Sequence, residues 1–192
     1  MVRDTRFLYT LFVALVALGR LAELRIAARN RRNLLARGGV EVAPEHYPYM
    51  VGLHTALLLS CPLEVWLLLG RPFVPLLAGA MLLVLVLAAA LRWWVISTLA
   101  GRWTTCIVVL PGVPPVTGGP YRFLRHPNYL AVILEIVSLP MVHTAWLTAI
   151  VFSLANGLLL RVRIRAEEAG LSRASDYDAT LGDRPRLLPG GR

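Results

Sequence analysis

Residues 73–100 read FVPLLAGAMLLVLVLAAALRWWVISTLA, and Arg92 is the only charged side chain among them. A run of about 20 apolar residues is long enough to cross the hydrocarbon core of a bilayer as a helix. The whole chain of 192 residues shares this bias, because 57% of it is hydrophobic and only 16% is charged. Such a composition excludes a disordered chain, a collagen-like fibre and a water-soluble domain. The sequence therefore predicts an all-α, polytopic membrane protein.

Four more apolar runs flank this one, at residues 7–24, 50–69, 129–142 and 145–160. Together with residues 73–100 they predict about five transmembrane helices in a single domain, residues 1–192. The run 129–142 is short for a span, so four spans are the alternative. Residues 7–24 also resemble the apolar part of a signal peptide, but no small-residue cleavage site follows them directly.

The net charge of +9 is carried by arginine, because the chain contains no lysine. The arginines occur in short clusters between the apolar runs, which argues against a nucleic-acid-binding face. Basic residues gather in the first loop, in residues 101–128 and after the last run, and cytoplasmic loops are enriched in such residues. This pattern predicts that the N-terminus lies outside, that the C-terminus is cytoplasmic, and that all polar-rich segments face one compartment.

Residues 118–130, GGPYRFLRHPNYL, stand at the predicted cytoplasmic mouth of the fourth span. The tyrosines and basic side chains of this block offer stacking faces and hydrogen-bond donors: Tyr121, Arg122, Arg125, His126 and Tyr129. Pro127 suits the first turn of a helix, where free backbone N–H groups can bind an anion. The block would suit a ligand with a carboxylate and an aromatic base. A belt of interfacial Arg and Tyr anchors is the alternative interpretation.

Residues 163–168, RIRAEE, leave the membrane at the end of the fifth run. On a helix Asn156, Arg163 and Glu167 lie on one face, and the last two form an i, i+4 pair. A salt bridge that caps the span is the simpler interpretation of that pair. Two carboxylates, Glu64 and Glu135, lie inside apolar runs, where an unpaired charge is costly. Glu135 is a candidate general base or a structural hydrogen-bonding group, and the structural role is favoured for Glu64.

Four stretches together resemble the isoprenylcysteine carboxyl methyltransferase family of integral-membrane, S-adenosylmethionine-dependent enzymes: LAGRWT (99–104), GGPYRFLRHPNY (118–129), RIRAEE (163–168) and RPRLLP (184–189). The stretches RNRRN (29–33), GVEV (39–42) and HYP (46–48) are similar to a bacterial subgroup associated with type III polyketide synthases, whose members methylate phenolic lipids such as alkylresorcinols or alkylpyrones. That subgroup implies a place in the bacterial inner membrane, with the site facing the cytoplasm.

The family resemblance implies roles for particular residues. His126 and Tyr129 would hold S-adenosylmethionine, and Tyr121, Arg125, Pro127 and the backbone from Gly119 would complete the pocket. Arg163 and Glu167 would lie at the reaction centre, with Glu135 as a further catalytic candidate from its burial alone. The chain departs from the family at residues 112–116, GVPPV, because a histidine common there is absent. Its two cysteines have no metal-ligand spacing, so no metal is expected.

The sequence thus favours methyl transfer to an oxygen, phenolic or carboxylic, of a lipophilic acceptor that enters from the membrane. A carboxylate acceptor needs no base, whereas a phenol needs one, for which Glu167 and Glu135 are the candidates. An NADPH-dependent membrane reductase, carboxyl methylation of an isoprenylcysteine-like substrate and a non-catalytic scaffold are the alternatives.

Overall fold

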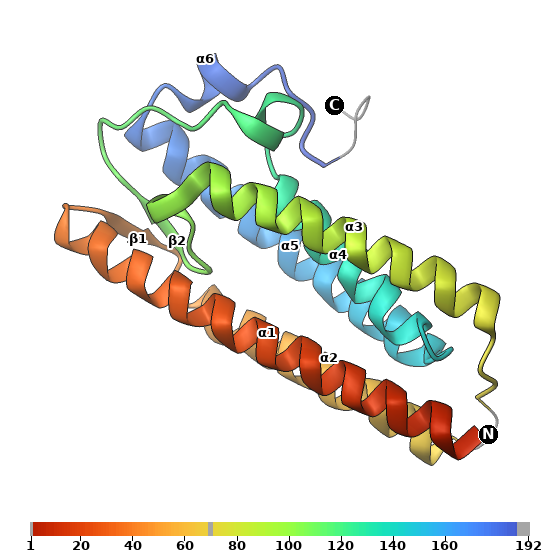
Figure 1. The fold of residues 1–192 in the computed structure, drawn as a ribbon. Coiled ribbons are helices and arrows are strands. Elements are labelled where there is room, and N and C mark those ends of the chain that lie inside the picture. The colour runs from red at the N-terminus through yellow and green to blue at the C-terminus, as the bar shows by residue number, and fades with distance from the viewer. Residues whose placement is uncertain (1, 69–70, 188–192) are drawn as a thin grey trace.

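The structure is a computed structural model that describes residues 2–68 and 71–187, and helices dominate this part of the chain (Figure 1). The five main helices follow one another along the chain: α1 (Val2–Ala36), α2 (His46–Leu67), α3 (Pro75–Leu99), α4 (Pro127–Met141) and α5 (Trp146–Ala174). Within the described residues, four of them are long and apolar enough to cross a membrane. The fifth, α4, has 15 residues and rises only about 22 Å. The predicted polytopic helical fold is confirmed.

Two helices, α1 and α5, are longer than the spans predicted from the sequence. α1 and α5 run well past residues 7–24 and 145–160, because arginine and alanine continue the helix beyond each apolar run. The extension of α5 is the part that carries Arg163 and Glu167. Leu69, at the end of the second predicted span, and residues 188–189 of the last motif lie outside the described residues.

The helices alternate in direction, so that their polar ends gather together (Figure 1). α1 packs against α2, α2 against α5, and α4 lies between α3 and α5. The outward faces remain apolar: the exposed fractions of Leu154 and Leu158 on α5 are 68% and 70%. Exposed leucines on a helix suit contact with lipid, because exposing the same apolar side chains to water would cost free energy.

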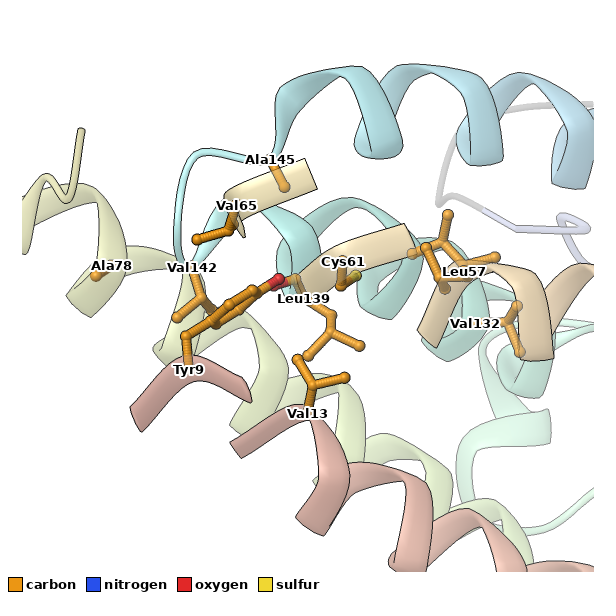
Figure 2. Close-up of a cluster of buried hydrophobic side chains, with 11 residues drawn as sticks. Tyr9, Val13, Leu57, Cys61, Val65, Ala78, Val132, Leu139, Val142 and Ala145 are labelled. Carbon is orange, nitrogen blue, oxygen red and sulfur yellow. The ribbon is translucent and has the colours of Figure 1, made fainter. Parts of the chain in front are cut away.

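An apolar core fills the end of the bundle remote from the polar segments (Figure 2). Tyr9 of α1 reaches into it and donates a hydrogen bond to the Leu139 carbonyl of α4 at 3.1 Å. At the same end the Glu64 carboxylate accepts hydrogen bonds from the first turn of α5, at 2.7 Å from Thr148 N, and pairs with Arg71 at 2.7 Å. The favoured structural role of Glu64 is therefore what the structure shows.

The polar end contains a two-stranded sheet that the helical prediction omitted. β1 (Val40–Val42) pairs antiparallel with β2 (Ile107–Val109), with Glu41 opposite Val108. Gly38 enables the turn from α1 into β1, because its φ of 85° lies in the left-handed region. Asn30 of α1 donates to the Trp103 carbonyl at 2.8 Å. The first loop and residues 101–128 are thus fastened together.

The segment between α3 and α4 is mostly irregular, as its prolines predict. It contains two short 3-10 helices, η1 (Ala100–Arg102) and η2 (Gly119–Arg122), before α4 begins at Pro127. Proline suits this first position because it fixes φ and has no N–H to leave unpaired. The chain ends its described part with α6 (Tyr177–Leu181) and a segment that returns to the start of α4.

Candidate active site

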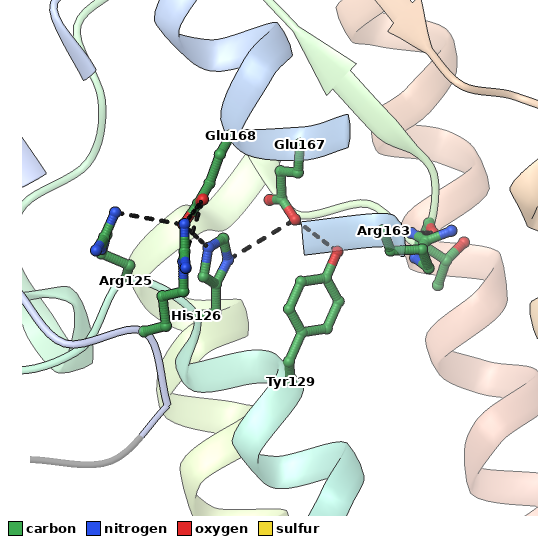
Figure 3. Close-up of polar contacts among 8 residues, drawn as sticks. Arg125, His126, Tyr129, Arg163, Glu167 and Glu168 are labelled. Carbon is green, nitrogen blue, oxygen red and sulfur yellow. Dashed lines mark hydrogen bonds and ion pairs between the residues drawn. The ribbon is translucent and has the colours of Figure 1, made fainter. Parts of the chain in front are cut away.

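The start of α4 and the polar end of α5 face each other and form a cluster of polar contacts (Figure 3). His126 precedes α4, and Tyr129 follows one turn inside it. Arg163, Glu167 and Glu168 project from α5 toward them. The two predicted motifs, which are far apart in the sequence, therefore form one site.

Glu167 is held from one side only. The Tyr129 hydroxyl donates to Glu167 Oε2 at 2.5 Å, and His126 Nδ1 lies 3.9 Å from the same oxygen. The rings of His126 and Tyr129 stack with their centroids 5.4 Å apart. Among the described residues, nothing donates a hydrogen bond to the second oxygen, Oε1, which leaves that atom for a ligand.

Glu168, the neighbour of Glu167, anchors the surrounding loop. It accepts hydrogen bonds from His126 Nε2 at 3.0 Å, from Arg125 at 3.4 Å and from Arg186 at 2.6 Å. The backbone of Arg125 and His126 also donates to the carbonyls of Pro185 and Arg186. The C-terminal segment thus fixes the position of the His126 ring.

Arg163 is almost fully buried, with an exposed fraction of 4%. It donates to the Thr105 carbonyl, just before β2, at 3.0 Å. Among the described residues Arg163 forms no ion pair with Glu167, although the i, i+4 spacing allows one. Arg163 instead binds the Thr105 carbonyl, and Glu167 binds the Tyr129 hydroxyl. The charge of Arg163 remains available to a ligand in the site.

A cavity of about 450 Å³ opens beside this cluster and continues between the helices. Ligand sites of small molecules commonly have volumes of about 300–1,000 Å³. Seven of the nine predicted site residues line it: Tyr121, Arg125, His126, Tyr129, Glu135, Arg163 and Glu167. The other two, Gly119 and Pro127, are not among the lining residues.

Gly119 has a local structural reason to be glycine. Its φ is 55°, and a Cβ added there would lie 2.2 Å from the Thr98 hydroxyl oxygen. The close approach lets η2 pack on the end of α3, which places the Tyr121 side chain in the wall. Burial, and then the nearby Glu167 charge, raise the pKa of the Tyr121 hydroxyl, so that this group stays neutral.

The deeper part of the cavity contains charges that the sequence did not connect. Glu135 of α4 accepts hydrogen bonds from Arg20 of α1 at 2.6 Å and from both Nε and Nη2 of Arg92 on α3. Glu23 pairs with Arg20 at 2.5 Å. His54 of α2 also lines this region. Arg20, Glu23 and Arg92 each interrupt an apolar run, and this was the signal that could have identified them.

Several buried polar atoms of residues in the cavity wall form no hydrogen bond with the described residues. Trp103 Nε1, Asn128 Oδ1 and Arg163 Nε have no hydrogen-bond partner among the described residues, and all three residues line the cavity. Buried polar groups are normally satisfied, so unpaired ones mark a place for a ligand. The unpaired atoms include two N–H donors, on Trp103 and Arg163, and one oxygen acceptor, on Asn128. Such a set fits the amino, carboxylate and hydroxyl groups of S-adenosylmethionine.

The fold is that of a polytopic helical membrane protein with a polar site at one end and a cavity between its helices. The model of the isoprenylcysteine carboxyl methyltransferase (ICMT) family matches residues 80–173. The chain is also 37% identical over 168 residues to the Bacillus subtilis (strain 168) protein YpbQ, named as uncharacterized, covering 88% of this chain and 99% of that protein. The chain belongs to the ICMT family of membrane methyltransferases.

Two further similarities agree with this. A Haemophilus influenzae protein named as uncharacterized is 27% identical over 169 residues, which cover 86% of this chain and 95% of that protein. The eukaryotic intramembrane Ras methyltransferase ICMT has the same fold, with a TM-score of 0.56 at 19% identity. That match covers 74% of this chain, and the chain spans about half of that structure, 53%. The residues that match the family model, 80–173, do not include α1 and α2.

Proposed function

We propose that this protein transfers a methyl group from S-adenosylmethionine to an oxygen of a lipophilic acceptor. The observation that carries the proposal is the Tyr129–Glu167 hydrogen bond, which holds a carboxylate at 2.5 Å at the polar end of a cavity that continues between membrane helices. Family membership adds the cofactor, because the family uses S-adenosylmethionine.

The residues divide the work by position. His126, Tyr121 and Tyr129 would bind the cofactor, with the orphaned atoms of Trp103 and Asn128 as further contacts. When bound, S-adenosylmethionine supplies a methyl group on a positively charged sulfur, which keeps the electron pair of the broken carbon–sulfur bond. The apolar walls would exclude water and admit the acceptor tail from the bilayer.

Glu167 is well placed to accept the proton of a phenolic acceptor. Tyr129 occupies Oε2 and thereby orients the carboxylate, while Oε1 is left to accept a hydrogen bond from the acceptor hydroxyl. The acceptor oxygen would form the new bond to the methyl carbon, and its proton would pass to Glu167. Arg163 would stabilise the developing phenolate, or would clamp a carboxylate acceptor directly.

Glu135 is less suited to the role of base. Arg20 and Arg92 together engage both of its oxygens. Glu135 also lies six residues after Tyr129 on α4, about 9 Å farther along the helix axis. The geometry favours Glu167 as the base and leaves Glu135 for a different task.

The proposed acceptor class rests on a resemblance in the N-terminal half. The stretches RNRRN (29–33), GVEV (39–42) and HYP (46–48) resemble the bacterial subgroup, and this supports a phenolic or enolic lipid such as an alkylresorcinol or alkylpyrone. A neighbouring gene for a type III polyketide synthase would strengthen this assignment.

An acceptor panel tests the proposal. Purified protein in lipid nanodiscs would receive S-adenosylmethionine with a radiolabelled methyl group and, separately, an alkylresorcinol, an alkylpyrone or a farnesylated cysteine. We expect the label in the phenolic lipids. Label only in the farnesylated cysteine would replace the phenolic acceptor by a carboxylate, and label in none of the three would contradict the proposed acceptor class.

A further inference from the structure

The deep charge cluster, which consists of Arg20, Glu23, Arg92 and Glu135, has an arrangement that packing alone does not require. It brings together three helices, since Arg20 and Glu23 lie on α1, Arg92 on α3 and Glu135 on α4. The Arg20–Glu135 pair measures 2.6 Å and the Arg92–Glu23 pair 4.0 Å. All four residues line the cavity of the proposed active site.

Placing these four charged side chains within apolar helices costs free energy. Charged groups at membrane depth are rare, and those that occur usually face an internal cavity and serve binding or transport. By contrast, Glu64 pairs with Arg71 in the loop after α2, outside the cavity lining, and accepts a hydrogen bond from the first turn of α5. A cluster that only joined helices would have no reason to present its side chains to a ligand space.

The cluster retains unused hydrogen-bonding capacity. A guanidinium has five N–H donors, and among the described residues Arg92 and Arg20 each direct two hydrogen bonds at carboxylates. His54 lies in the same wall, and its Nδ1 is 2.8 Å from the Met50 carbonyl. Because a carbonyl only accepts, Nδ1 carries the proton and Nε2 is left as an acceptor. The wall can therefore donate to an oxygen and accept from a hydroxyl.

The charges of the cluster balance, with two guanidinium groups against two carboxylates. An additional carboxylate there would leave an unbalanced charge among apolar walls, whereas a neutral hydroxyl or carbonyl would not. Glu135 lies about 9 Å along α4 from Tyr129. Glu135 and Glu167 both line the same cavity of about 450 Å³, so one acceptor bound there can meet both residues.

We propose that Arg20, Glu23, Arg92 and Glu135, together with His54, form a recognition subsite for a second, neutral oxygen on the ring of the acceptor. The protein then selects lipids whose ring head carries two oxygen functions over lipids whose head carries one. The inference rests on the proposed methyl transfer. The family model matches residues 80–173, and three of the subsite residues lie outside this range: Arg20, Glu23 and His54. This agrees with a role in recognising the acceptor of this particular chain.

Two acceptors that differ by one hydroxyl group test this subsite: 5-pentadecylresorcinol and 3-pentadecylphenol. The full chain in nanodiscs would be assayed for kcat/KM with each, and S-adenosylhomocysteine affinity would be measured in parallel. We expect the wild type to prefer the resorcinol by about tenfold or more, the effect of a buried hydrogen bond to a charged group. His54→Phe, which leaves the ion pairs intact, and Glu135→Gln should reduce this preference toward one without changing S-adenosylhomocysteine affinity.

Glu64→Gln is the control, because it alters a buried carboxylate and its ion pair with Arg71 outside the cavity lining and should keep the preference. Equal kcat/KM for the two lipids in the wild type, or an unchanged preference in both subsite variants, would overturn the inference while methylation itself still supports the proposed function. If neither lipid is methylated, the proposed function fails for phenolic lipids. Quenching of tryptophan fluorescence by the two lipids then decides the subsite: tighter binding of the resorcinol, lost in the variants, supports it, and equal binding refutes it.

Discussion

At the scale of single residues, Glu167 is the group on which the proposed chemistry depends. Glu167→Gln keeps the hydrogen bond from Tyr129 but cannot take up a proton. We expect kcat on a phenolic lipid to fall about 10²- to 10⁴-fold, the usual contribution of a general base. S-adenosylhomocysteine affinity, measured by calorimetry, should stay within about twofold. Full activity of the variant on a phenolic lipid would remove Glu167 from the role of base.

Cys106 offers a residue-scale probe of the cavity wall. Burial first, and then the neighbouring Glu41 carboxylate, raise the pKa of its thiol from 9.0 to about 11. Because only the thiolate reacts, its alkylation at pH 8 should be about a hundredfold slower than that of a free thiol. The rate, followed by mass spectrometry, should rise about tenfold per pH unit until it levels near pH 11. Cys106→Ser provides the control for Cys61, and a plateau already at pH 9 would contradict the raised pKa.

The residue scale also shows how far sequence reasoning extended. The block at residues 118–129 and the RIRAEE motif could be predicted as a candidate site, because their side chains suit a cofactor and match a family pattern, and the structure brings them together. The partners of Glu135 could not, because Arg20 and Arg92 are separated from it by 115 and 43 residues. Only the packing of α1 and α3 beside α4 brings them together, and no local pattern encodes that packing.

At the scale of elements, the C-terminal segment holds in place residues 117–126, the loop before α4. The Arg184 side chain donates to the carbonyls of Thr117, at 3.3 Å, and of Tyr121. Arg184→Ala should therefore weaken S-adenosylhomocysteine binding about three- to tenfold, with unchanged helix content by circular dichroism. Arg173→Ala, which removes an exposed hydrogen bond to its own helix, is the control. Equal affinities of the two variants would show that the segment does not support the site.

The start of α5 depends on a side chain from another helix. Glu64 accepts from the backbone N–H groups of Leu147 and Thr148 and balances the charge of Arg71. Glu64→Ala leaves these buried N–H groups without a partner, so we expect a loss of about 1–3 kcal/mol in the free energy of unfolding and a lower Tm. Thermal unfolding in detergent would measure it. A Tm equal to that of the wild type would mean that water satisfies these groups.

Element boundaries were predictable where a single physical signal set them. Pro127 and Pro75 each begin a helix, as expected from a residue with fixed φ and no N–H. The three-residue strands β1 and β2 were missed, because Val-Glu-Val and Ile-Val-Val are too short to establish a period of two. Their pairing joins segments far apart in the chain, so only the folded molecule reveals it.

At the scale of the whole molecule, the arrangement predicts which cofactor stabilises the protein. A ligand at a hundred times its Kd adds about 2.7 kcal/mol to the free energy of unfolding. S-adenosylhomocysteine should therefore raise the Tm by several degrees, and NADPH should leave it unchanged. A shift with NADPH and none with S-adenosylhomocysteine would favour a reductase instead.

The gathering of polar segments at one end of the bundle follows from the arginine pattern, and the structure agrees with it (Figure 1). That this end faces the cytoplasm of a bacterial cell stays a prediction of the positive-inside rule. The arrangement serves the proposed chemistry, because a water-soluble cofactor could reach the site from one side while the acceptor arrives from the bilayer.

The central claim is that a methyl group moves to an oxygen atom of a lipid acceptor. Its most direct test supplies the nanodisc-embedded protein with S-adenosylmethionine that carries a ¹³C methyl group, together with an alkylresorcinol, and records the ¹³C spectrum of the extracted lipid. We predict one new methoxy signal, which is absent from the Glu167→Gln reaction. A methyl signal on carbon, or no incorporation by protein that binds S-adenosylhomocysteine, would contradict the account.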